Sequence, residues 1–197
     1  MIRPLLFLVV LAVPACLSAQ PHSGLGFKAG VQMATTRSAT FHYEPVVGGL
    51  VGLYVPLSCG TRFELQPELL LSAQGSAITF NENGRRELRS YYALLPITAK
   101  VFLTNCLNLA GGVQGGMLLA AQEDGEDVKD RFKSADAALV VGLGLDLQSG
   151  WDLTFRYTNG LTSILASDNV LYPTNRTWQC SAGYRFARFH HGRGRRR

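Results

Sequence analysis

The sequence predicts an all-β protein, an eight-stranded antiparallel up-and-down transmembrane β-barrel. Three observations carry this prediction. Long segments alternate between apolar and polar residues, short and long connections follow one another in turn, and an apolar leader precedes a chain with no later run long enough for a membrane helix. A tilted strand crosses a membrane with about 9–11 residues, whereas a helix needs about 20. The 197 residues suffice for one barrel domain.

Eight segments are expected to be strands because they combine β-forming residues with apolar and polar alternation. Most reach ten residues or more, which exceeds the usual strand of a soluble domain, about 5–6 residues. The phase of the alternation is ambiguous in the second segment and in the upper half of the fourth. The expected strands are Leu25–Ala34, Val46–Leu57, Arg62–Gln74, Arg89–Phe102, Leu107–Gln122, Asp136–Gln148, Trp151–Asn159 and Thr177–Phe186.

The segment "WDLTFRYT" shows the alternation most clearly. From Trp151 to Thr158 every odd position is large and apolar, and every even position is polar. In a membrane barrel the apolar face contacts lipid and the polar face lines the lumen. In a soluble, lipocalin-like barrel the same apolar face fills the interior instead. The alternation therefore predicts a barrel, and other features must decide which face points outward.

The lengths of the connections give a second signal. Three are short, at 58–61, 104–106 and 149–150, and four are long and polar, at 35–45, 75–88, 123–135 and 160–175. Because they alternate, an up-and-down barrel has all its short turns at one end and all its long loops at the other. Bacterial outer-membrane barrels have this layout, with short periplasmic turns. We therefore expect both ends of the chain on the periplasmic side.

The chain divides into a leader, a barrel and a tail. Residues 1–19 are a predicted secretory signal peptide, with Arg3, nine apolar residues from Leu5 to Val13, and small residues up to Ala19. A lipoprotein site at Cys16 is an alternative. The barrel domain is expected at 20–186, and 187–197 is expected to be a basic, flexible tail. Because this tail carries most of the formal net charge of +5, we expect no nucleic-acid partner.

If the polar faces line the lumen, charged side chains of both signs meet there. The interior of an eight-stranded barrel is just wide enough to be filled by side chains. We expect opposite charges to pair in the lumen and to block a wide pore. The predicted lumen ion-pair network consists of Lys28, Arg62, Glu64, Glu68, Lys100, Asp146, Asp152, Arg156 and Arg185.

Aromatic residues near the strand ends favour the membrane barrel over the soluble one. Aromatic side chains gather at both interfaces of a membrane, on either side of an apolar band. The predicted girdles are Phe63, Trp151, Tyr184 and Phe186 at the short-turn ends and Tyr91 and Trp178 at the long-loop ends.

Three cysteines follow the predicted signal peptide, and no pair of them has metal-ligand spacing, so we expect no metal. Cys59 and Cys106 fall in the first two short turns, which flank neighbouring strands. They are a candidate disulfide at the periplasmic rim of an exported protein. Cys180 is expected to face lipid and to remain free.

No catalytic residues are predicted. The four histidines, at positions 22, 42, 190 and 191, lie outside the expected strands and away from any Ser and Asp in a triad-like arrangement. The glycine-rich pieces lie inside strands, where a phosphate-cradling turn is not expected. We therefore expect a protein that is not an enzyme and that needs no cofactor.

Several pieces of the chain resemble a known family. They are "GLGFKAGVQMA", "RFELQPELLLSAQGS", "YYALLPITAKVFL", "DVKDRFKSADAALVVGLGLDL" and "WQCSAGYRF", and together with the stretches between them they span Gly24 to Phe186. The chain is similar to the outer-membrane β-barrel proteins of Bacteroidetes, the porin-like group that includes PorT. The resemblance implies a location in the outer membrane of a Gram-negative bacterium and insertion by the barrel-assembly machinery. It implies no defined activity. In many outer-membrane proteins the chain ends at the last strand's aromatic residue, whereas eleven residues follow Phe186 here.

The expected function is a structural or binding role exerted through the extracellular loops, with outer-membrane lipid and lipopolysaccharide as partners. A narrow porin-like channel is one alternative. A PorT-like accessory role in protein secretion, with periplasmic secretion components as partners, is another. The soluble lipocalin-like binder is a third.

Overall fold

The computed structural model describes residues 23–37, 44–80, 84–123, 126–129, 133–162 and 174–189. Most of these residues lie in β-strands, and no helix among them is long and apolar enough to cross a membrane. The strands are β1 (Gly24–Arg37), β2 (Glu44–Tyr54), β3 (Leu57–Ser58), β4 (Phe63–Phe80), β5 (Gly84–Phe102), β6 (Leu107–Glu123), β7 (Glu126–Asp127), β8 (Ala135–Asp146), β9 (Trp151–Gly160) and β10 (Thr174–Arg188).

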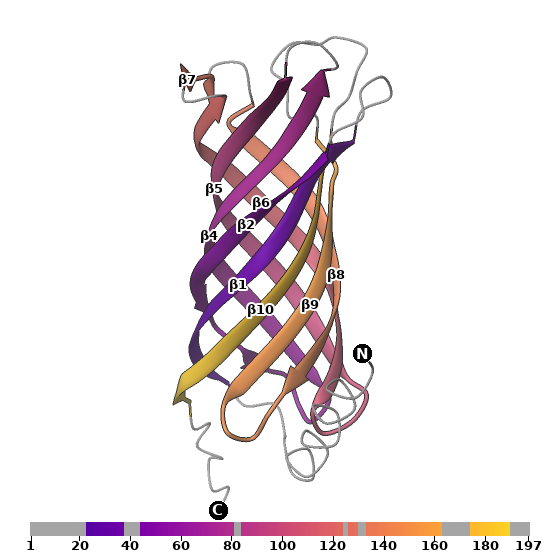
Figure 1. Ribbon diagram of the computed structural model, residues 1–197. Helices are drawn as coiled ribbons and strands as arrows, with labels where there is room; N and C mark the ends of the chain where they lie inside the picture. The colour runs from indigo at the N-terminus through magenta and orange to yellow at the C-terminus, as the bar shows by residue number, and fades with distance from the viewer. Residues whose placement is uncertain are drawn as a thin grey trace, which may run out of the picture.

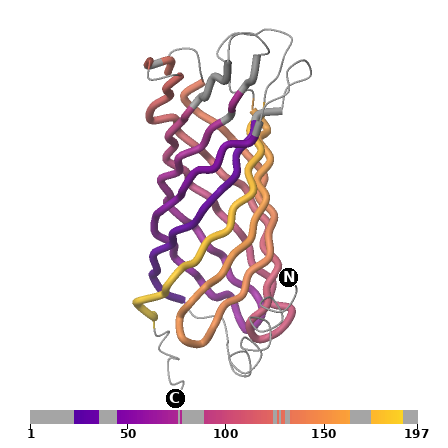
Figure 2. Tube along the Cα trace, in the orientation of Figure 1, coloured from indigo at the N-terminus to yellow at the C-terminus, as the bar shows by residue number. Residues whose placement is uncertain are grey.

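Eight of these strands close into an antiparallel barrel (Figure 1). The ring runs β2, β1, β10, β9, β8, β6, β5 and β4, and the pairing of β4 with β2 completes it. The first and last strands, β1 and β10, lie side by side (Figure 2) and pair from Gly24 with Arg188 to Arg37 with Thr174. Closure pairs the main chain of every long strand on both sides, which a hydrocarbon environment demands. The predicted eight-stranded barrel is confirmed.

The short turns lie together at one end of the barrel, at the bottom of Figure 1. Gly60 and Gly150 adopt φ values of 89° and 97° in two of these turns, a conformation that glycine reaches without strain. The Gly150 N–H donates to the carbonyl of Leu147 at 3.0 Å, which tightens the β8–β9 turn. Tight turns of this kind fix the register of the strands that they join.

The β4–β5 hairpin is longer than its sequence indicates. The expectation of a loop over 75–88 is wrong, because the ladder continues from Gly75 paired with Arg89 up to Phe80 paired with Gly84. Polar composition indicates a loop, but ladder hydrogen bonds join main-chain groups and require no apolar side chain. β4 and β5 therefore rise above the shorter β8 and β9 (Figure 1).

Two strand ends also differ from the prediction. β2 stops at Tyr54 and does not continue to Leu57, because Pro56 has no N–H to donate to a ladder. At the other end of the chain, β10 continues to Arg188, two residues past the predicted domain boundary. The Phe189 N–H then donates to the Ser23 carbonyl at 2.8 Å. The predicted signal peptide lies outside the described residues, as does most of the predicted tail.

The barrel exposes apolar side chains and buries charged ones. In β9, Trp151, Leu153 and Phe155 expose 47%, 41% and 50% of their surface, whereas Asp152 and Arg156 expose 1% and 3%. On the other strands most large apolar side chains likewise point outward, while buried polar and charged side chains line the lumen together with a few apolar ones such as Leu70 and Leu94. This is the arrangement of a membrane barrel. The lipocalin-like alternative, with the apolar face inside, is therefore wrong.

Candidate functional site

The half of the lumen nearest the short turns contains a cluster of buried charges. Lys100, on β5, is at its centre. Its Nζ lies 2.7 Å from Asp152 Oδ2, 3.2 Å from Asp146 Oδ1 and 3.6 Å from Glu64 Oε1. These four side chains are at most 9% exposed. One ammonium group thus lies against carboxylates from β4, β8 and β9.

Glu68, on β4, is a second centre. Its Oε1 accepts a hydrogen bond from Lys28 Nζ at 3.0 Å and one from Arg156 Nη2 at 2.8 Å. Its Oε2 lies 3.0 Å from the same Arg156 nitrogen, and Gln66 Nε2 donates to Oε1 at 2.6 Å. β4 and β9 are four strands apart in the ring of eight. The Arg156–Glu68 pair therefore crosses the full width of the lumen.

Two further contacts join these centres into one network. Lys28 Nζ lies 3.8 Å from Asp152 Oδ1, and Arg185 Nη2 lies 3.4 Å from Asp146 Oδ2. Four bases and four acids are thereby brought together, and their formal charges balance. A buried charge is tolerated when it is paired and hydrogen-bonded. This lumen network consists of Lys28, Glu64, Glu68, Lys100, Asp146, Asp152, Arg156 and Arg185.

Arg62 is not part of the lumen network, and its predicted place there is wrong. It is exposed and lies in the turn before β4, which begins only at Phe63. The alternation that assigns a face to each residue applies within a strand and fails one residue outside it. The Arg62 carbonyl accepts a hydrogen bond from the Phe102 N–H at 2.9 Å.

A buried tyrosine that the sequence did not indicate lies beside the lumen network, paired in register with Glu68. Tyr54 has no exposed surface, and Lys28 Nζ lies 5.0 Å from the centre of its ring. A Cβ added at Gly26 or Gly183 would lie 2.4 Å or 2.9 Å from the Tyr54 ring, so both glycines make room for it. The ambiguous phase of the β2 segment hid this inward position.

The opposite half of the lumen is lined mainly by neutral groups. The Gln32 amide donates to Ser72 Oγ at 2.6 Å and to the Ala73 carbonyl at 2.7 Å, and it accepts from Gln179 Nε2 at 3.1 Å. It does so where the ladder between β2 and β4 is interrupted between Pro45 and Leu50. A side-chain amide from β1 thus satisfies a main-chain carbonyl at the break in this ladder.

Apolar side chains fill one side of the same half. They come from β2, β4, β5 and β6, joined by Val128 from the segment after β7. The Val128 N–H donates to the Ala121 carbonyl at 3.0 Å, which fixes this segment to β6. The cluster consists of Leu50, Leu70, Tyr92, Leu94, Leu118, Ala121 and Val128.

Five of the six predicted girdle residues lie within four residues of a strand end, whereas Tyr91 lies seven residues inside β5. Phe63, Trp151 and Phe186 are exposed at the short-turn end, where the Trp151 and Tyr184 ring centres are 5.2 Å apart. Tyr91 and Trp178 are exposed toward the long-loop end. Two rings beside Trp178 extend the set, with centres 5.5 Å (Phe155) and 4.5 Å (Tyr157) from that of Trp178.

The predicted disulfide between Cys59 and Cys106 is wrong. Cys59 is free and exposed, whereas Cys106 is disulfide-bonded, so the two do not pair with each other. Cys106 is buried in the turn before β6, whereas Cys59 is exposed. Cys180 is exposed and free, as predicted.

No group of three or more His, Cys, Asp or Glu side chains in the described ranges has the arrangement of a metal site. The four histidines lie outside those ranges. The lumen network itself contains carboxylates, but each lies within 4 Å of a lysine or arginine. Its chemistry is that of a charge-balanced plug.

Comparisons with known proteins agree with this architecture. A family model of the outer membrane protein β-barrel domain matches residues 18–166. Among solved structures, Ail, the attachment invasion locus protein of Yersinia pestis, is 15% identical with a TM-score of 0.52, covering 84% of this chain and 99% of Ail. Neisserial surface protein A is 13% identical with a TM-score of 0.50, covering 83% and 98%.

These two likenesses show the fold, and a search of curated proteins finds no match. The family model covers most of the barrel. With the closed ring and its apolar exterior, it identifies the kind of protein. The chain belongs to the outer membrane protein β-barrel domain family and is an outer-membrane β-barrel protein.

Proposed function

We propose that this protein is a non-enzymatic, non-conducting barrel that acts as a structural or binding protein at its extracellular end. The observation that carries the proposal is the lumen network, which joins strands on opposite sides of the ring. Arg156 meets Glu68 at 2.8 Å across the lumen, and Lys100 meets Asp152 at 2.7 Å beneath them. Buried ion pairs of this geometry hold a passage closed without leaving a charge unpaired.

Because the lumen is filled, we assign the recognition of binding partners to the extracellular end. There the β4–β5 hairpin extends the wall, and β7 pairs with β6. Asp136 accepts a hydrogen bond from Thr162 Oγ1 at 2.5 Å, and the same hydroxyl accepts from the Ala137 N–H at 3.0 Å. These bonds hold the start of the β9–β10 connection against β8. A rigid barrel that presents its loops in this way suits a binding role.

Conductance in planar lipid bilayers tests the proposal. The full mature chain is expected to show no steady current. The double variant Arg156→Ser with Glu68→Ser removes the cross-lumen pair and shortens both side chains, and it is expected to conduct. Thr158→Ser is the control, because this buried lumen residue lies outside the network. A steady ohmic current through the unmodified chain would refute the proposal and support the narrow channel.

A PorT-like accessory role in secretion is the second alternative. Cross-linking from the segment after β10 to periplasmic secretion proteins in intact cells tests it. Cross-links to such proteins that disappear when residues 190–197 are deleted would favour that role. Cross-links to the barrel-assembly machinery alone would leave the binding role in place.

A further inference from the structure

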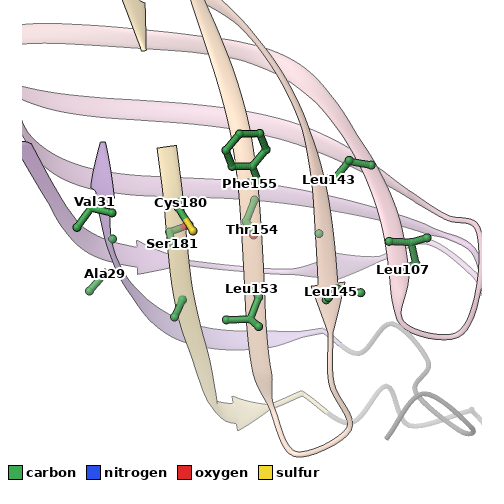
Figure 3. A pocket seen from close by; sticks show the side chains of 13 residues that line it. Ala29, Val31, Leu107, Leu143, Leu145, Leu153, Thr154, Phe155, Cys180 and Ser181 are labelled. Atoms are coloured by element: carbon green, nitrogen blue, oxygen red, sulfur yellow. The ribbon is translucent and has the colours of Figure 1, made fainter. Parts of the chain in front are cut away.

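An apolar groove of about 610 Å³ runs along the outer surface of the barrel, over β1, β10, β9 and β8 (Figure 3). The Cys180 thiol lies on its floor, and Leu153 and Phe155 project beside it from β9. These side chains are exposed on the outer face of the barrel and do not point into the lumen. The groove therefore opens into the hydrocarbon of the bilayer.

Strand register explains why the surface is hollow here. Ala29 on β1 pairs with Ala182 on β10, and Ala182 pairs with Leu153 on β9. The next outward row toward the loops contains Cys180, another small side chain. Small residues follow one another across two strands, so the outer surface is recessed here relative to the rows nearer the turns and nearer the loops.

Large aromatic side chains lie at both ends of the groove. Toward the turns, the Tyr184 ring centre lies 6.2 Å from that of Phe27 and 5.2 Å from that of Trp151. Toward the loops, Phe155 and Trp178 stack with centres 5.5 Å apart. An aromatic cluster at the strand ends, such as that of Trp151 and Tyr184, marks an interfacial zone of a membrane. The groove begins directly above the turn-side cluster, so it lies in the periplasmic leaflet.

A basic side chain lies below the groove on the same strand. Arg188 is exposed at the end of β10 and donates from Nη2 to the Gln148 carbonyl at 2.6 Å, which fixes the guanidinium beside the β8–β9 turn. It is six residues from Ala182, about 20 Å along an extended strand. This separation suits a lipid whose phosphate lies at the interface while its chain reaches the groove.

We propose that the groove binds one acyl chain of a phospholipid from the periplasmic leaflet, with the phosphate held by Arg188. The lining is almost entirely apolar, which suits a hydrocarbon chain. Guanidinium groups recognise phosphate through paired N–H donors. A lipopolysaccharide chain would have to reach the groove from the opposite leaflet, on the long-loop side.

Lipid retention tests the proposal. The full chain is extracted from outer membranes in mild detergent and weighed by native mass spectrometry. The unmodified protein is expected to retain one phospholipid. Ala182→Leu fills the floor of the groove and is expected to lower lipid retention about tenfold. The acyl chain then loses the apolar contact of two methylene groups, which weakens binding by about this factor. Ala99→Leu is the control, since Ala99 faces outward on β5, away from the groove.

The phosphate contact has its own test. Arg188→Gln is expected to weaken quenching of tryptophan fluorescence by brominated phosphatidylglycerol, because Trp151 and Trp178, the two tryptophans of the chain, flank the groove. Arg62→Gln, another exposed arginine at the turn end, should leave the quenching unchanged.

Three results would overturn the proposal. The first is equal retention by the Ala182→Leu and Ala99→Leu proteins. The second is retention of lipopolysaccharide in place of phospholipid. The third is a dimer that Ala182→Leu dissociates, which would assign the groove to a second copy of the chain. A gel assay of heat-modifiability shows beforehand that each variant is folded.

Discussion

The two halves of the lumen are filled by side chains of different chemistry. The half at the short turns contains the eight charged side chains of the lumen network. The half at the long connections contains amides and hydroxyls around Gln32, with an apolar cluster around Leu94 and Tyr92. Charges thus gather where the short turns fix the strands, and neutral groups occupy the end from which the long connections leave.

The difference follows from the cost of burying a charge. Removing an ion from water costs several kcal/mol, and only close pairing with good geometry offsets it. The tight turns below the lumen network give its side chains fixed positions. A misplaced buried amide or hydroxyl group costs less free energy than a misplaced buried charge. The neutral half therefore tolerates the interrupted ladder between β2 and β4, where Gln32 meets the Ala73 carbonyl.

The largest expected effect comes from removing the central ammonium group. Lys100→Met keeps most of the side-chain volume but leaves Asp152 and Asp146 without their closest cation. We expect the free energy of unfolding to fall by about 3–5 kcal/mol, the cost of breaking a buried pair on one side. Urea unfolding in lipid vesicles, followed by tryptophan fluorescence, measures it.

Lys133→Met is the matched control, because Lys133 is exposed beyond β6. Its unfolding midpoint should match that of the unmodified chain. If Lys100→Met unfolded at the same urea concentration as Lys133→Met, the charged half would not depend on its ion pairs, and the contrast between the halves would disappear.

A smaller effect is expected in the neutral half. Gln32→Leu removes the donor that meets the Ala73 carbonyl and Ser72 Oγ. Leaving such a buried acceptor unpaired costs about 1–3 kcal/mol. The same urea titration measures the loss, with the exposed Gln122→Leu as control. A loss as large as that of Lys100→Met would show that neutral and charged groups contribute equally.

Alternation along the strands predicted the fold and the face of most site residues. Lys28 and Asp152 are buried in the lumen, and Trp178 is exposed, as a period of two requires. Alternation could not predict which lumen side chains contact each other. Arg156 meets Glu68 from 88 residues away, and only the ring order and register bring them to the same height.

The errors occurred where a strand ends or the alternation is unclear. Arg62 precedes its strand by one residue, and Cys59 lies in a turn, so neither side chain follows the period of two. Tyr54 was missed because glycines and apolar residues occupy both faces of β2. The paired ends of β4 and β5 were predicted to be a loop because their residues are as polar as those of a loop.

The smallest expected effect concerns the contact of Tyr54 with Lys28 in the charged half. A Cβ at Gly26 would lie 2.4 Å from Cε1 of the Tyr54 ring, so Gly26→Ala must displace the ring on which Lys28 lies. We expect a loss of about 1 kcal/mol, at the low end for an overpacked interior, since one methyl group is added. Gly111→Ala is the control, because nothing lies within 4 Å of its added Cβ. Equal urea midpoints for the two variants would show that the Tyr54 ring moves freely and that the lumen network does not depend on its position.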